Sequence, residues 1–207
     1  DANSEIDTLK GEIALLREQA VGRFESGVPP RILDASEGQE SRVAAIRGAK
    51  SYVLLVAFTF DLDDVTAALI SSKSRTSKLD ERVLIDQEQA LNGNIRNLRP
   101  KVMQLVANGV SVRLYSKRRL HAKVLLTDVG QFIGSCNWTN ASLRNVERVA
   151  RFHLRGPAEK AERDWFDALW AEGKDFNGKT ELPTTPQPTG RKGRATSHDP
   201  RTVHFPD

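Results

Sequence analysis

Four polar side chains in the second half of the chain are spaced so that they could act together on an anion. His121 and Lys123 lie two residues apart beside the apolar run 124–126, and an extended strand would point both to one face. Ser135 and Asn137 are also two residues apart and would share a face. An imidazole surrounded by an ammonium, a hydroxyl and an amide suits an oxyanion with several oxygens, of which a phosphodiester is the obvious example.

The two pairs are expected to meet because the sequence between them predicts a β-hairpin. Residues 124–126 form the first apolar strand, Asp128-Val129-Gly130 supplies the turn, and residues 131–133 begin the return strand. A hairpin lays the two faces side by side. An isolated His-x-Lys pair on a strand is usually structural, whereas the whole set at this spacing favours a phosphodiesterase site.

This stretch resembles the motif of the phospholipase D superfamily, in which His-x-Lys is followed after four residues by Asp and then by Gly-Ser-x-Asn. The matching positions are His121, Lys123, Asp128, Gly134, Ser135 and Asn137, and Trp138-Thr139 and Glu147 also look like the family. The family usually has six residues between the Asp and the Gly, and this chain has five. We expect the turn at 129–130 to absorb the difference, because a one-residue shift within a strand would reverse its faces.

The resemblance implies a role for each motif residue. One histidine attacks phosphorus to form a phosphohistidine, and a second histidine protonates the leaving oxygen and later activates water. Lys123 and Asn137 are then expected to bind nonbridging oxygens with the help of Ser135, and Glu147 to orient the histidine ring. Asp128 lies beyond the strand and is expected to fix the turn or the packing around it.

Only one copy of the motif is present. Relatives with one copy complete the site as homodimers, so the resemblance implies a homodimer to which each subunit contributes His121. The charges that bind phosphate come from side chains, so no metal and no other cofactor is expected. Cys136 is the only cysteine, which excludes an internal disulfide, and its position between Ser135 and Asn137 predicts a packing role.

The chain of 207 residues carries a net charge of +4 and has a sequence pI of about 9.3. This mildly basic balance favours nucleic acid or an anionic membrane surface as a partner. Lys117, Arg118 and Arg119 precede the motif directly, and they could bind neighbouring phosphates of a substrate. The alternative, an ordinary charged strand end, has equal weight.

Three parts are expected along the chain: an amphipathic helix in 1–27, a phospholipase D-like domain in 28–173, and a disordered tail rich in proline and basic residues in 174–207. The first helix could pack on its own domain or mediate association with a partner. No run of about 18 apolar residues predicts a transmembrane segment. No charged and apolar leader is visible, so we expect an intracellular rather than a secreted protein, with its compartment left open.

The pattern of the middle part predicts an α/β domain with a mixed β-sheet between helical layers. Strands are expected at 31–33, 51–60, 82–86, 110–115 and 149–154, in addition to the hairpin. Helices are expected at 37–47, 64–72, 100–108 and 158–172, and loops at 71–78 and 87–99. The resemblance to the superfamily covers residues 30–172 and implies the same architecture.

These observations leave three hypotheses for function. The first is a nuclease that hydrolyses nucleic-acid phosphodiesters without a metal. The second is a phospholipase-like hydrolase of an anionic phospholipid such as cardiolipin or phosphatidic acid. The third is a non-catalytic nucleic-acid-binding or scaffold protein on the same fold.

Overall fold

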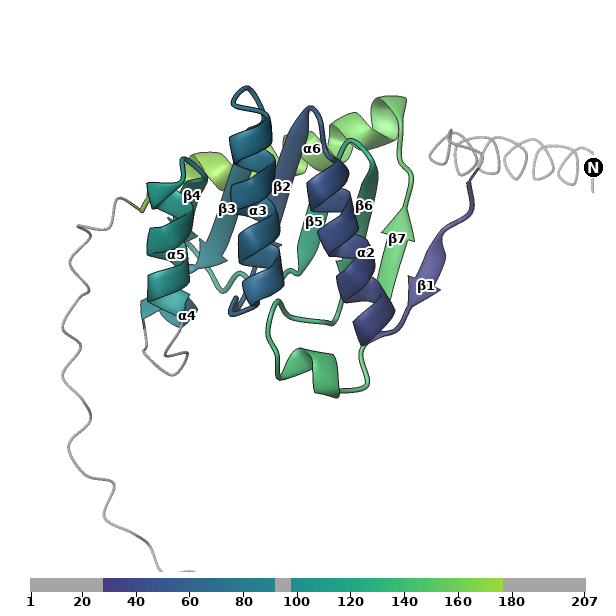
Figure 1. Ribbon diagram of the computed structural model, residues 1–207, viewed down its shortest axis with the longest axis horizontal. Coiled ribbons are helices and arrows are strands. Elements are labelled where there is room, and N and C mark those ends of the chain that lie inside the picture. Colours follow the sequence, from purple (N-terminus) through teal and green to yellow (C-terminus); the bar gives the residue numbers. More distant parts are fainter. Residues whose placement is uncertain (1–27, 92–97, 177–207) are drawn as a thin grey trace, which may run out of the picture.

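The computed structural model describes residues 28–91 and 98–176, which form an eight-stranded mixed sheet with the strand order β1-β7-β6-β5-β2-β3-β4-β8 (Figure 1). Neighbours β2, β3 and β4 run parallel, and every other neighbouring pair is antiparallel. The strands are β1 Arg31–Leu33, β2 Tyr52–Ala57, β3 Asp80–Asp86, β4 Ser111–Tyr115, β5 Val124–Thr127, β6 Gly130–Gly134, β7 Val149–Phe152 and β8 Lys174–Asp175. The helix expected in 1–27 and the tail beyond residue 176 lie outside the described residues.

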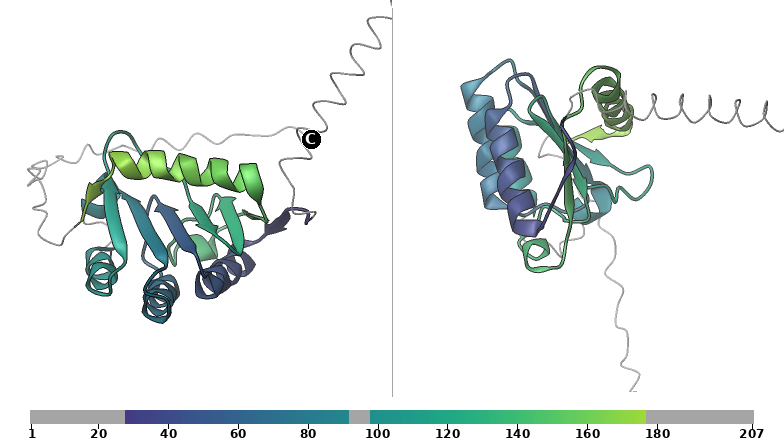
Figure 2. Two further views of the ribbon diagram at one scale, coloured as in Figure 1. Left: turned by 90° about the horizontal axis from the view of Figure 1, so that it is seen from above. Right: turned by 90° about the vertical axis from the view of Figure 1, so that its right-hand side faces the viewer.

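Helices cover both faces of the sheet. Three of them, α2 (Ala35–Gly48), α3 (Asp63–Arg75) and α5 (Leu98–Ala107), lie side by side on one face, and α6 (Gly156–Glu172) crosses the other face (Figure 2). Two short elements, α4 (Gln87–Leu91) and the 3-10 helix η1 (Ser142–Arg144), occupy connections. The predicted mixed sheet between helical layers is therefore confirmed.

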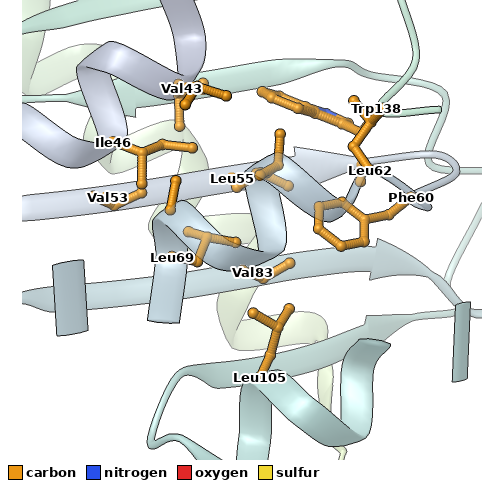
Figure 3. Close-up of a cluster of buried hydrophobic side chains, with 14 of the residues drawn as sticks. Val43, Ile46, Val53, Leu55, Phe60, Leu62, Leu69, Val83, Leu105 and Trp138 are labelled. Atoms are coloured by element: carbon orange, nitrogen blue, oxygen red, sulfur yellow. The ribbon is translucent and has the colours of Figure 1, made fainter. Parts of the chain in front are cut away.

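Strand β2 is the centre of the core, and all six of its residues are buried. Val53 and Leu55 point to the layer of α2, α3 and α5, where they join a cluster that includes Ile46, Leu69 and Trp138 (Figure 3). The alternate residues of β2 join a second cluster beneath α6. A strand buried on both faces reads as a continuous apolar run, and the sequence has such a run here.

Two segments expected to be loops contain helix. Helix α3 continues to Arg75, well into the basic segment 71–78, and its Ser72 is buried and donates a hydrogen bond to Glu81 at 2.8 Å. Residues 87–91 form α4, because Asp86 provides a side-chain cap by accepting from the N–H of Gln89 at 3.1 Å. The first stretch looked irregular because the contact with Glu81 that orders it comes from β3.

The sheet extends past residue 173, where we expected the domain to end. Strand β8 pairs with β4 and is the outermost strand on that side of the sheet, and Phe176 is buried against the core. Among the described residues, no helix is both long enough and apolar enough to cross a bilayer.

The topology gathers several chain segments at one edge of the sheet, meaning the side formed by the ends of the strands. Val56 near the end of β2 pairs with Val124 at the start of β5, and Val124 pairs with Ile133 near the end of β6. The carboxyl ends of β2, β3, β4 and β6 therefore lie at the same edge as the amino ends of β5 and β7. In open α/β sheets this is the edge where ligands bind.

Candidate active site

His121 and Lys123 lie in the segment immediately before β5, and their side chains are in contact. Lys123 Nζ is 3.1 Å from His121 Nε2, and it donates to the carbonyl oxygen of His121 at 2.7 Å. An ammonium can only donate, so Nε2 accepts and this geometry assigns the ring proton to Nδ1. Lys123 is buried and His121 is exposed, so the imidazole is open to a ligand while its cationic neighbour is held in place.

Phe58 is a site residue that sequence reasoning missed. It follows β2 at the same edge of the sheet, and its ring meets the His121 imidazole edge-on with centroids 4.7 Å apart. The Arg119 guanidinium lies 4.8 Å and the Lys123 ammonium 5.3 Å from the centroid of the same ring. One aromatic side chain thus positions the imidazole and two cations. The sequence signal that could have identified Phe58 is its position as an aromatic residue directly after the apolar strand β2.

Ser135 and Glu147 form the second part of the site, where β6 ends and β7 is about to begin. The Ser135 hydroxyl donates to the Glu147 carboxylate and accepts from the N–H of Arg148 at 3.2 Å. The expected role of Glu147 was to orient the His121 ring, whereas in the structure its carboxylate bonds Ser135 and acts electrostatically on Lys123. The structure therefore links His121, Lys123, Glu147 and Ser135 as a chain of neighbouring groups.

Asn137 lies on a segment that is held in place by the hydrogen bonds of two buried side chains. The buried Trp138 donates from Nε1 to the carbonyl of Val56 at 3.1 Å, and the buried Arg42 donates to the carbonyl of Cys136 at 3.2 Å. Cys136 points into the core, as its position between Ser135 and Asn137 predicts. Asn137 is half-buried, and its Oδ1 has no hydrogen-bond partner within the described part of the chain.

The electrostatics of the site favour a neutral imidazole. Removal from water, and then the positive charges of Lys123 and Arg119, lower the pKa of His121, while the carboxylate of Asp86 acts in the opposite direction. Burial lowers the pKa of Lys123, and the nearby Glu147 opposes that shift. A neutral histidine keeps one ring nitrogen unprotonated, which attack on phosphorus requires.

Asp128, although part of the motif, is separated from these residues by the length of β5. It lies in the hairpin turn at the opposite edge of the sheet and accepts from the N–H of Lys50 at 3.1 and 3.2 Å. That contact makes it a structural residue of the turn and removes it from the set that could touch substrate. The turn itself has two residues, since Thr127 pairs with Gly130, and the strands on both sides still deliver Lys123 and Ser135 to one edge.

The three cations before the motif take different positions. Arg119 stacks on Phe58 beside His121, whereas Arg118 is directed toward Tyr115, where it opposes the rise in the pKa of Tyr115 that burial causes. Lys117 is exposed. Of the three residues expected to bind substrate, Arg119 is therefore the one that the structure brings to the imidazole. In the ranges 28–91 and 98–176, no group of three His, Cys, Asp or Glu side chains could hold a metal ion.

A family model described as the phospholipase D-like domain of cardiolipin synthase matches residues 43–170. The chain belongs to the phospholipase D-like family. A search of curated proteins finds no match.

Solved structures of the family share the fold. Nuc from Salmonella typhimurium, a phospholipase D family member, superposes with a TM-score of 0.64 at 23% identity, over 72% of this chain and 97% of that one. NucT from Helicobacter pylori gives 0.57 at 18% identity, over 72% and 99%. Phosphatidylserine synthase from Haemophilus influenzae gives 0.56 at 16% identity, over 67% of this chain and 36% of the synthase. At these identities the likeness is one of fold.

Proposed function

We propose that this phospholipase D-like protein is a metal-independent nuclease that cleaves nucleic-acid phosphodiesters through a phosphohistidine on His121. The observation that carries the proposal is the contact of His121 Nε2 with Lys123 Nζ at 3.1 Å, at an edge that also holds Ser135 and Glu147. The unprotonated Nε2 can attack phosphorus once Lys123 Nζ leaves it for a nonbridging oxygen of the substrate. The adjacent ammonium can neutralise charge on the nonbridging oxygens.

In the proposed reaction, Nε2 of His121 forms a bond to phosphorus and the bond from phosphorus to the leaving oxygen breaks. Lys123 and the amide N–H of Asn137 bind nonbridging oxygens, and Ser135 assists them. A general acid gives its proton to the leaving oxygen. Water then attacks the phosphohistidine and gives a proton to the same group, which releases the phosphate product and restores both residues.

The general acid in this proposal is His121 of a second copy of the chain. The other histidine of the described residues, His153, lies at the opposite edge of the sheet, because its neighbour Phe152 pairs with Gln131. Two apolar side chains beside the site support an interface between copies. Ile133 is 51% exposed on β6 and Val146, next to Glu147, is fully exposed.

Nucleic acid is the favoured substrate because Arg119 is held on Phe58 beside the imidazole, where it could bind a phosphate next to the scissile one. Hydrolysis of an anionic phospholipid such as cardiolipin is the second candidate. The description of the matching family model and the shared fold of phosphatidylserine synthase both favour it. The third alternative, a non-catalytic nucleic-acid-binding or scaffold protein, predicts binding without turnover.

A cleavage assay in EDTA separates these functions. Wild type, His121→Ala and the control His153→Ala are incubated with single-stranded DNA, duplex DNA, RNA and cardiolipin vesicles. The nuclease proposal expects cleavage of nucleic acid by wild type and His153→Ala, and none by His121→Ala. Release of a lipid headgroup would replace it with the phospholipase candidate, and equal nucleic-acid binding by all three proteins without cleavage would replace it with the binding module.

A further inference from the structure

A buried carboxylate lies behind the histidine segment and was not part of the predicted site. Asp86 is the last residue of β3 and is 3% exposed. Its Oδ1 caps α4 by accepting from the N–H of Gln89, and its Oδ2 accepts from the N–H of Leu120 at 2.8 Å. One carboxylate therefore ties the end of β3 and the start of α4 to the residue immediately before His121.

The bond to Leu120 restricts where His121 can lie. The segment 116–123 between β4 and β5 has no strand or helix of its own. Leu120 is anchored there by its buried side chain in the cluster beneath α6 and by its N–H on Asp86. A hydrogen bond to a charged acceptor is roughly twice as strong as one between neutral groups, so the position of the imidazole depends on this contact.

We propose that Asp86 is a positioning residue for His121: it fixes the backbone that carries the imidazole and supplies a negative charge opposite Lys123 and Arg119. The inference rests on the proposed role of His121 as the nucleophile. The charged groups that act on the ring are Lys123, Arg119 and Asp86, and the uncharged ring of Phe58 packs against it. Because the first two are cations, Asp86 is the group that opposes them.

Removing the charge gives a signal that a purely structural residue would not give. In Asp86→Asn the two cations act on the imidazole without opposition, so the pKa of His121 falls below its wild-type value. The acidic limb of the pH profile of kcat/KM, which reports the free nucleophile, moves to lower pH. Loss of one backbone contact also displaces the imidazole, and we expect kcat/KM to fall by up to about a hundred-fold.

Two further variants make the test selective. Asp86→Ser keeps an N-cap acceptor for α4, but it is shorter and uncharged, so it should fold and still lower the pKa of His121. Asp80→Asn removes a carboxylate at the opposite end of the same strand, where Asp80 pairs with Arg82 at 2.8 Å. It controls for the change in net charge and should leave the His121 titration unchanged.

The direct measurement is NMR titration of the His121 ring in the four proteins, which needs no turnover. A lower pKa in Asp86→Asn and Asp86→Ser, with Asp80→Asn like wild type, supports the inference. A wild-type titration in folded Asp86→Asn overturns it, whatever the cleavage assay shows. If wild type cleaves no substrate, the proposed nuclease function fails while the titration still decides whether Asp86 acts on His121.

Discussion

Arg42 packs over the indole ring of Trp138, with its guanidinium carbon 4.2 Å from the ring centroid, and both side chains are buried. The same guanidinium donates to the carbonyl of Cys136 and to the side chain of Gln39, which in turn donates to Asp64 on α3. A charge in the core thus fastens α2 to the segment that carries Ser135 and Asn137. Burial lowers the pKa of Arg42, which is the cost of placing the cation there.

Replacement of Arg42 should therefore destabilise the fold by an amount that depends on the shape of the new side chain. Arg42→Ala leaves a cavity beside Trp138 and a buried carbonyl at Cys136 without its donor, so we expect a loss of about 3 kcal/mol. Arg42→Met keeps an aliphatic chain against the indole and removes the desolvated charge, so its loss should be smaller. Urea unfolding of both variants measures the difference, and an equal loss would contradict this view of the contact.

Gly134 should tolerate no side chain, because β6 and β7 approach closely at the site. A Cβ at this position would lie 2.2 Å from the carbonyl oxygen of Arg148 and 2.9 Å from the Cα of Val149. Both are backbone atoms, so Gly134→Ala must push the strands apart, and we expect a loss of roughly 1–3 kcal/mol.

Gly48, the last residue of α2, provides the matched control. A Cβ there would meet only a methyl group of Val129 at 3.8 Å, which is an ordinary contact. Gly48→Ala should therefore be neutral or stabilising by up to about 1 kcal/mol. Thermal unfolding compares the two variants, and similar melting temperatures would show that the close approach at Gly134 is unimportant.

Glu81 should make stability depend on pH. Burial raises the pKa of Glu81 to about 7, and the hydrogen bond from Ser72 opposes the shift only in part. The folded protein therefore holds this proton more tightly than the unfolded chain does. The contribution of Glu81 to stability is fully present below its ordinary pKa near 4.5, declines as pH rises toward 7, and changes no further above that value.

Substitution of Glu81 tests that dependence. In Glu81→Gln the titrating group is absent, so the stability of the variant relative to wild type should increase between pH 5 and pH 8. The exposed glutamate Glu40 on α2 offers a control, and Glu40→Gln should show no such trend. Denaturant unfolding across this range gives the result, and parallel curves for wild type and Glu81→Gln would refute the prediction.

An interface beside the site should be sensitive to charge. Ile133→Asp or Val146→Asp would place a carboxylate in the apolar patch that the proposed dimer buries. We therefore expect either substitution to weaken association at least tenfold. Sedimentation velocity over a range of concentrations measures it. Met103→Asp provides the control, since Met103 is 41% exposed on α5, which covers the other face of the sheet. Equal association by all variants would move the interface elsewhere.

The part of the fold that local pattern controls was predictable. The apolar run of β2 and the hairpin turn at Asp128 are visible in neighbouring residues, and so is the arrangement of His121 beside Lys123. The gathering of these residues at one edge follows from topology, because β5 pairs with β2 across a long insertion.

Other features depend on partners that sequence does not reveal. Arg42 donates a hydrogen bond to the carbonyl of Cys136, 94 positions away, and nothing in the local sequence pairs the two. Asp86 closes an apolar strand like many solvated carboxylates, and only its contact with Leu120 distinguishes it. The hydrogen bond between Ser135 and Glu147 could not be predicted for the same reason, since the path of the chain between β6 and β7 decides which group the carboxylate meets.

The edge strands have a practical consequence for work on this protein. Strand β1 follows the first described residues and β8 precedes the last, and they are the two outermost strands of the sheet. Seven strand spacings of roughly 4.8 Å separate them by about 34 Å. Fluorophores attached near Val28 and Phe176 would therefore mark opposite sides of one subunit. In a symmetric pair of subunits, energy transfer between like labels would reveal which of the two outermost strands lies nearer the two-fold axis.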